Sequence, residues 1–289
     1  MSNRLHEDTP LFREAVNYTS ARTGFLARLV EKDYYCTILL DHLASSCPEL
    51  VFKGGTCLAK VHIGFFRMSE DLDFVIPVPA DVARSERSRR SQNAKGAVEA
   101  LERAIEGLRI NSPLTGANSS TQYVAEIAYP SVLGERQESI KVEIGLREPL
   151  LLPPVHAVAR TLLLDPISGA ESGVTADLAC IALPESMAEK LRAALSRRDP
   201  AIRDFYDIDH AIQTGRLQVA DPQFLQMVRS KLAVPGNPPA DVSPDRLSAL
   251  TRQVDAQLRP VLRQPDLEAF DLARAFAAVE AVARAVAAD

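Results

Sequence analysis

The stretch from Lys53 to Ile76, KGGTCLAKVHIGFFRMSEDLDFVI, decides how we expect this chain to fold. Its Gly-Gly-Thr turn predicts the start of a short apolar helix (Cys57, Leu58, Val61), and its Asp-Leu-Asp triplet predicts the start of a strand that prolines end. Alternate side chains of a strand share a face, so Asp71 and Asp73 should point the same way. The residues between and after them should point into a core, namely Leu72, Phe74 and Ile76.

Two carboxylates that share a face repel each other unless a cation lies between them. Mg²⁺, or Mn²⁺ in its place, takes oxygen ligands and keeps coordination positions for phosphate oxygens. The turn at Gly54 and Gly55 leaves backbone N–H groups at a helix start, where an anion is favoured. Either pattern alone is also typical of ordinary structure, a solvated strand edge or a simple turn. Together and in this order they predict a nucleotide site.

Length and composition indicate a globular protein with two lobes, because 289 residues with 46% hydrophobic content can bury a sizeable core. No apolar run is long enough to span a bilayer and the N-terminus is polar, so we expect a cytoplasmic protein without a membrane partner. The four cysteines lack metal-ligand spacing, which predicts reduced thiols and argues against a zinc site.

The net charge of −5 gives no bulk attraction to nucleic acid. An RNA substrate would have to be held by local basic clusters, of which the sequence has two. Each cluster alone is more typical of a solvated helix face than of an RNA-binding patch. The clusters are Arg84, Arg87, Arg89, Arg90 and Lys95, and then Arg192, Arg197, Arg198 and Arg203.

Hydrophobic periodicity predicts the remaining elements. Helices are expected at 9–44, at 56–63, within 81–107, and over almost everything from 184 onward, with a loop at 234–239 and a last helix at 266–288. Strands are expected at 50–52, 72–76, 123–129 and 139–145, and short ones near 159–164 and 176–183. Residues 111–117 are predicted to be a loop.

Glu143 is a third carboxylate of interest, because it lies mid-strand between Val142 and Ile144. An acid in a partly buried strand needs a partner or a metal. Beside the strand of Asp71 and Asp73 it would complete a cup for Mg²⁺. Alternatively it lies on an exposed face with Lys141 as its neighbour, and the pattern leaves both interpretations open.

The segment at 184–212, PESMAEKLRAALSRRDPAIRDFYDIDHAI, holds a second group of charged residues. Lys190 lies at the border of an apolar helical stripe, from where its amine could reach a triphosphate, although most single lysines are surface residues. Asp204 falls inside the stripe of the next helix, Asp207 at its border and Asp209 on the outer side. A buried carboxylate must be paired, and Lys190 or Arg203 is the expected partner. The pair could lock two helices together, orient the lysine for the nucleotide, or do both.

Four ordered motifs resemble those of the AbiEii/AbiGii-type nucleotidyltransferase toxins, which include the MenT-like toxins of mycobacteria. They are Lys53-Gly-Gly-Thr, Arg67-Met-Ser-Glu-Asp-Leu-Asp-Phe, Glu189-Lys-Leu-Arg-Ala and Arg203-Asp-Phe-Tyr-Asp-Ile. Glu31-Lys-Asp-Tyr-Tyr also resembles the N-terminal segment of that family, so the likeness runs from about Glu31 to Ile212.

The resemblance implies an α+β fold with a DNA-polymerase-β-like nucleotidyltransferase core, a mixed sheet flanked by helices, and a helical C-terminal lobe. The expected domains are 1–183 and 184–289, the second completing the active-site cleft. The resemblance further implies a toxin with a cognate antitoxin partner. Studied members of the MenT type transfer nucleotides to the 3′ end of tRNA and block translation.

By position in the motifs, Asp71 and Asp73 would be catalytic metal ligands, Lys190 the essential basic residue and Asp204 the acid of the last motif. Glu143 is the candidate third ligand. The resemblance implies nucleotide contacts, with Lys190, from Lys53, Gly54, Gly55, Thr56, Arg67, Ser69 and Asp207.

We therefore expect a Mg²⁺-dependent nucleotidyltransferase, in which an acceptor hydroxyl attacks the α-phosphorus of an NTP and pyrophosphate leaves. One alternative is a small-molecule enzyme of the aminoglycoside-modifying kind, which the acidic charge favours. Others are a protein NMP-transferase and a catalytically idle binding protein. The sequence assigns no particular nucleotide, tRNA or oligomeric state.

Overall fold

The computed structural model describes residues 4–79, 81–134 and 137–288. The chain divides into two compact units, one ending at Ile181 and one starting at Ala182, and each is described by itself.

Unit 1 is built on a seven-stranded sheet in the order β3-β4-β5-β2-β1-β7-β6. The pairs β2·β5 and β1·β7 are parallel and the other pairs are antiparallel, so the predicted mixed sheet is confirmed. The strands are β1 Val51–Lys53, β2 Leu72–Val75, β3 Arg109–Ala117, β4 Gln122–Pro130, β5 Gln137–Gly145, β6 Val155–Ala159 and β7 Ala176–Cys180.

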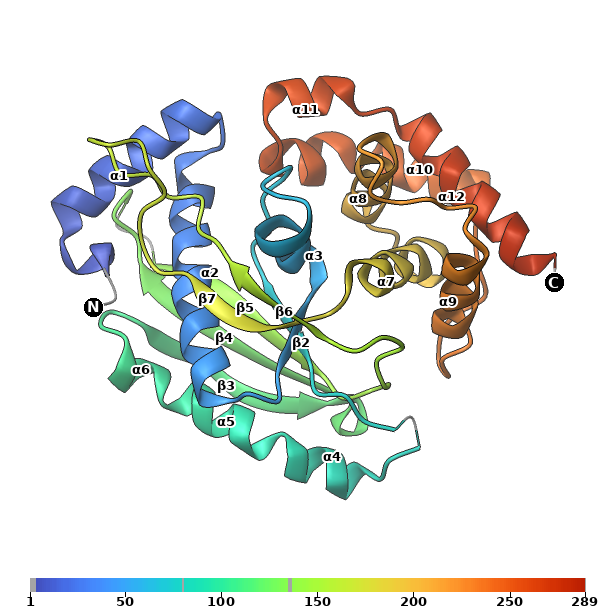
Figure 1. Cartoon of the computed structure of the whole chain (residues 1–289), viewed down its shortest axis with the longest axis horizontal. Coiled ribbons are helices and arrows are strands. Elements are labelled where there is room, and N and C mark those ends of the chain that lie inside the picture. Colours follow the sequence, from blue (N-terminus) through green and yellow to red (C-terminus); the bar gives the residue numbers. More distant parts are fainter. Residues whose placement is uncertain (1–3, 80, 135–136, 289) are drawn as a thin grey trace. The chain divides into compact units, whose positions relative to one another are not determined.

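Helices pack on the face of the sheet to which Leu72 and Phe74 point, and both of these side chains are buried. Helix α2 lies against β7, α5 packs against β3, and the two helices contact each other (Figure 1). The helices of unit 1 are α1 Thr9–Thr23, α2 Ala27–Ser46, α3 Gly54–Cys57, α4 Arg84–Arg90, α5 Gln92–Glu99 and α6 Leu101–Ala104, with 3-10 turns at Leu5–Glu7 and Asn118–Ser120.

The predicted helix at 56–63 is one α-helical turn, α3, followed by a π-helical turn, η2, at Leu58–His62. Its buried residues differ from the expected apolar set. Cys57 and Leu58 are buried as expected, but Lys60 is buried too, and Val61 is only half-buried. All four cysteines are buried and free, as predicted.

Two predictions in unit 1 were wrong. Residues 111–117 belong to β3, an edge strand in which Leu114 alone is fully buried, so it lacks the hydrophobic alternation that would have revealed it. The short strand expected near 159–164 lies earlier, at β6, and only Ala159 of that strand is buried.

Unit 2 is helical, as predicted. Its helices are α7 Leu183–Ser196, α8 Ile202–Gln213, α9 Pro222–Leu232, α10 Pro244–Thr251, α11 Gln264–Ala269 and α12 Leu272–Ala287, with short η4 Val254–Leu258 and η5 Arg259–Val261. The last helix is not continuous, because Asp271 interrupts it and caps α12 by accepting a hydrogen bond from the Arg274 N–H. Helix α7 packs on α8 and α9, and α12 packs on α8 and α9.

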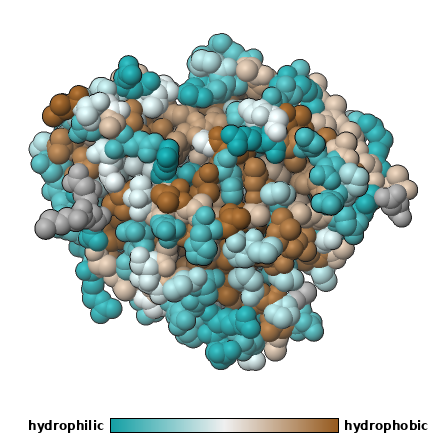
Figure 2. All heavy atoms as spheres, in the orientation of Figure 1, coloured by the Kyte–Doolittle hydropathy of each residue, from teal (hydrophilic) through white to brown (hydrophobic). Residues whose placement is uncertain are grey.

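No helix among the described residues is both long enough and apolar enough to cross a membrane. The face drawn in Figure 2 carries hydrophobic residues scattered among hydrophilic ones.

Candidate functional site

A row of charged side chains crosses the sheet of unit 1 at Asp73. Lys53 of β1 pairs with Asp73 of β2, which in turn pairs with Glu143 of β5. Residues directly opposite each other on paired strands project from the same face. Asp73 therefore lies between an ammonium group and a second carboxylate. Asp71 lies two residues earlier and is half-buried, so the predicted alternation of acids and core residues is what the structure shows.

The glycine turn lies directly against this row. Gly54 has a φ of +78°, a conformation that favours glycine, and a Cβ at this position would lie 2.2 Å from Oδ2 of Asp73. Both the backbone conformation and the missing side chain are therefore needed for the turn to approach the carboxylate.

Gly55 brings two more predicted residues to the same place. A Cβ on Gly55 would lie 2.5 Å from Nη2 of Arg67 and 3.0 Å from Oγ of Ser69. The Thr56 hydroxyl donates a hydrogen bond to the Asp71 carbonyl, which fixes the start of β2 to the turn. The nine residues predicted for this part of the site thus come together in unit 1.

Burial and crowding of negative charge both perturb Asp73. Burial, and after it the charges of Glu143 and Asp71, raise the pKa of its carboxyl to about 6, against the opposing effect of Lys53 and Lys141. A divalent cation would remove this repulsion. The donors are all carboxylate oxygens, which suits a hard cation such as Mg²⁺ or Mn²⁺.

The three carboxylates do not form a ready-made metal cup. In the part of the chain that the structure describes, no group of three or more His, Cys, Asp or Glu side chains is arranged to hold a metal ion. Glu143 instead bonds to Lys141, whose Nζ lies 3.1 Å from Oε2. Asp71 and Asp73 fit the metal by their chemistry and their shared face, whereas Glu143 is engaged by a cation of the protein itself.

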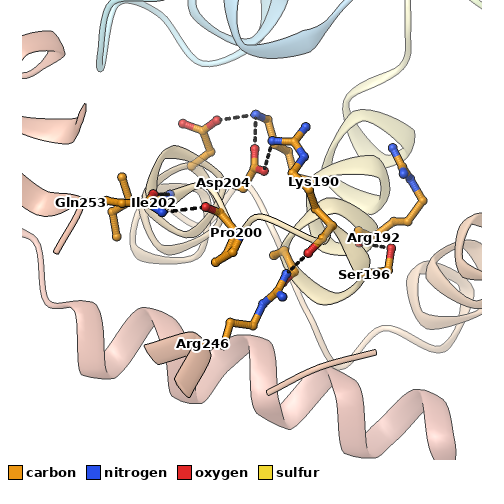
Figure 3. Close-up of polar contacts among 11 residues, drawn as sticks. Lys190, Arg192, Ser196, Pro200, Ile202, Asp204, Arg246 and Gln253 are labelled. Carbon is orange, nitrogen blue, oxygen red and sulfur yellow. Dashed lines mark hydrogen bonds and ion pairs between the residues drawn. The ribbon is translucent and has the colours of Figure 1, made fainter. Parts of the chain in front are cut away.

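In unit 2, Lys190 lies between two carboxylates. Its Nζ is 2.7 Å from Oδ1 of Asp204 and 3.0 Å from Oδ2 of Asp207, and the side chain of the lysine is 14% exposed (Figure 3). Arg197 also reaches Asp204, at 3.3 Å. Asp204 thus pairs with Lys190, one of the two partners expected for it.

Two further residues of unit 2, Arg246 and Gln253, support this group. The guanidinium of Arg246 donates to the carbonyls of Ala194 and Arg197 at the end of α7. Gln253 accepts from the N–H of Ile202 and donates to the carbonyl of Pro200, so it fixes the start of α8 (Figure 3).

Asp209 lies on the outer side of the apolar stripe of α8, as expected, but it is buried and not exposed. Its carboxylate is buried beneath a two-pronged contact with Arg274 of α12, with N···O distances of 2.8 and 2.7 Å. Sequence periodicity placed Asp209 outside the apolar stripe of α8 correctly, but a later helix covers that side.

A buried ion pair between Lys60 and Asp33, next to the glycine turn, was not predicted from the sequence. Nζ of Lys60 lies 2.6 Å from Oδ1 of Asp33, and neither side chain is more than 3% exposed. The ammonium also donates to the Asp33 carbonyl, the Thr37 hydroxyl and the Arg160 carbonyl. A lysine inside the apolar run Leu58-Ala59-Lys60-Val61 was the available signal.

The Glu31-Lys-Asp-Tyr-Tyr segment of α2 makes several further contacts inside unit 1. Glu31 accepts hydrogen bonds from the N–H of Val132 and the hydroxyl of Ser131, at 2.6 and 2.7 Å. Tyr35 stacks on Tyr129 with ring centroids 4.3 Å apart. These contacts tie α2 to the end of β4.

Comparison with known proteins matches this chain to one family over most of its length. The profile of the nucleotidyl transferase AbiEii toxin family, of type IV toxin–antitoxin systems, matches residues 38–280. The chain belongs to this family and is a nucleotidyltransferase. No curated protein matches the chain.

Two crystal structures from Helicobacter pylori share the fold. One, of a candidate nucleotidyltransferase, has a TM-score of 0.51 and 14% identity, covering 90% of this chain and 96% of its own. The other, of JHP933, has a TM-score of 0.50 and 15% identity, covering 91% and 93%. The predicted nucleotidyltransferase fold is confirmed.

Proposed function

We propose that this AbiEii-family nucleotidyltransferase transfers NMP from an NTP to the 3′ end of tRNA in the cytoplasm, in a reaction that needs Mg²⁺, and so blocks translation. The observation that carries the proposal is the approach of the Gly54 turn to the Asp73 carboxylate. It supports the proposal because an acidic strand and a glycine turn at a helix start, the two features expected of a metal–nucleotide site, lie against each other.

In unit 1, Asp71 and Asp73 would hold the metal, which when bound would neutralise charge on the phosphates. The turn at Gly54 and Gly55, with Arg67 and Ser69 against it, would hold phosphate oxygens by backbone and side-chain donors. Glu143, once released from Lys141, would accept the proton of the acceptor hydroxyl or become a metal ligand. The hydroxyl then attacks the α-phosphorus, the bond to the β-phosphate oxygen breaks, and pyrophosphate leaves.

In unit 2, we assign Lys190 a phosphate-binding role as a point charge. Asp204 and Asp207 hold its ammonium in place, so that little side-chain entropy is lost when a phosphate binds. That the second unit completes the nucleotide cleft stays a prediction.

Helix α4 supports an RNA acceptor. It carries four arginines in seven residues, and Arg84, Arg89 and Arg90 are exposed. Glu86 binds the last two of these, which reduces the net positive charge of the helix but holds their guanidinium groups in place. The overall charge of −5 favours the alternative, a small cationic acceptor.

The experiment incubates the protein with each α-labelled NTP and Mg²⁺ in the presence of total RNA, an aminoglycoside mixture, or neither. We expect label in tRNA, lost with chelator and restored by Mg²⁺ or Mn²⁺. Label in the drug, or only in the protein, would reject the RNA acceptor and identify the alternative. Binding of tRNA should weaken steeply with salt, since phosphate contacts carry it.

The matched variants are Asp71→Asn with Asp73→Asn, and Glu70→Gln as control. Glu70 lies in the same segment but pairs with Lys32 and Arg28, away from the charged row. The double variant should lose transfer and the control should keep it. Full activity of the double variant would remove the mechanism. Growth arrest on expression of the wild type, absent for the double variant, is the expected toxic effect.

A further inference from the structure

Lys141 has no assigned role of its own in the proposed reaction, in which Glu143 must first leave it, yet it lies among the three carboxylates of the site. Its Nζ is 3.1 Å from Oε2 of Glu143, two residues along the same strand and on the same face. Leu72 pairs with Val142, so continuing the register by one residue places Asp71 beside Lys141. The ammonium therefore faces Glu143 along its own strand, Asp71 on the β2 side and Glu126, its partner in β4, on the other side.

We propose that Lys141 is a built-in counter-ion that competes with the divalent metal for Glu143. This rests on the proposed function, because it presumes that a metal binds at Asp71 and Asp73. Without metal, the ion pair balances part of the negative charge and engages the Glu143 carboxylate. Metal binding must break the pair before Glu143 becomes available.

The charges of the row support a competition. Three carboxylates, Asp71, Asp73 and Glu143, face two ammonium groups, Lys53 and Lys141, so these five side chains carry a net charge of about −1 rather than −3. Glu126 of β4, which pairs with Lys141 and accepts a hydrogen bond from the Ser139 hydroxyl, adds one more negative charge beside them. The pair is also weak enough to be displaced. Its side chains are 44% and 30% exposed, and ion pairs of this kind are worth at most about 1 kcal/mol. A fully buried pair could not act as a reversible competitor.

The test measures binding of Mn²⁺ alone, without nucleotide or acceptor, by calorimetry and by the electron paramagnetic resonance signal of unbound Mn²⁺. Lys141→Met should lower the Kd by about two- to sixfold, because every molecule then presents an uncommitted Glu143. Lys141→Arg keeps the competitor and should stay near the wild-type Kd. Lys95→Met removes one positive charge elsewhere in unit 1, over the ring of Tyr123, and should leave the Kd unchanged.

A double-mutant cycle identifies the carboxylate involved. In a Glu143→Gln background, Lys141→Met should have less than half of its effect on log Kd, because the group it engaged is gone. An equal effect in both backgrounds would mean that Lys141 acts only through the general field, and would overturn the proposal. So would an unchanged or raised Kd for Lys141→Met.

Failure of the proposed function gives a different result. If the wild type and Lys141→Met both fail to bind Mn²⁺ at millimolar concentration, the metal site itself is wrong and this inference falls with it. If both bind equally, the metal site stands and only the role of Lys141 is rejected. Unfolding curves in chelator establish that each variant is folded.

Discussion

The Asp33–Lys60 pair makes a quantitative prediction about what holds the glycine turn. Lys60→Met removes an ammonium with four oxygen acceptors within 3.1 Å and leaves the Asp33 carboxylate buried, with the N–H of Leu162 at 2.8 Å still donating to it. Breaking a buried pair in this way costs about 3–5 kcal/mol. For a unit of this size, the expected fall in Tm is roughly 6–20 °C.

Tyrosine fluorescence during urea unfolding is the assay. The chain has no tryptophan, and five of its six tyrosines lie before residue 182, so the signal reports chiefly on unit 1. Arg89→Met is the control, because Arg89 makes an ion pair with Glu86 while its own side chain is 73% exposed. That variant should shift the free energy of unfolding by less than about 1 kcal/mol.

A second variant separates the lost charge from the lost packing. Combining Lys60→Met with Asp33→Asn leaves no buried charge, and the amide oxygen can still accept from Leu162. The double variant should therefore be more stable than Lys60→Met alone, by about 1–3 kcal/mol. If Lys60→Met costs under 1 kcal/mol, or the second substitution adds to the damage, the pair does not hold the turn as argued.

Three further predictions concern the site. Gly54→Ala should abolish transfer, whereas Gly64→Ala, which also has positive φ but no atom within 4 Å of the new Cβ, should cost only about 1 kcal/mol of stability and keep activity. Because the pKa of Asp73 is raised from 3.8 to about 6, the metal-free folded state binds extra protons between these values. Its stability should thus fall by about 1–3 kcal/mol as pH rises through that window, and Asp73→Asn should flatten this dependence in pH-resolved unfolding curves. Lys190→Met should abolish transfer and destabilise unit 2 in thermal unfolding. A Lys190→Met variant with wild-type transfer activity and wild-type thermal stability would contradict the role assigned to Lys190.

Strand periodicity was enough to place the acidic pair. In Asp71-Leu72-Asp73-Phe74 the polar and apolar residues alternate, and only one register buries Leu72 and Phe74 in a core that α2 and α5 cover. The same logic missed β3. An edge strand that buries little apolar surface has no such pattern, and Pro113 in its middle favoured a loop.

Helical periodicity located the polar groups of unit 2 but not their partners. The position of Asp204 inside an apolar stripe required a cation, and Lys190 was one of two candidates in the sequence. Asp209 lies on the outer side of the same helix, and its partner Arg274 lies 65 residues later. Nothing in the local pattern could indicate that α12 would cover that side, because the covering depends on tertiary packing.

Burial and partner charge decide which lysines hold the structure and which can meet a ligand. Lys60 has a fully buried side chain, and its ammonium already contacts Asp33, Thr37 and the Arg160 carbonyl, so a phosphate would have to displace these buried internal bonds. Lys190 keeps 14% of its side chain in solvent, so its ammonium could exchange protein oxygens for phosphate oxygens at lower cost. Lys141 is more exposed still, and its ion pair with Glu143 is weak. A bound metal ion could therefore displace its ammonium from Glu143 at little cost. These three lysines look alike in the sequence, and it is their surroundings that assign them to scaffold, ligand binding and competition.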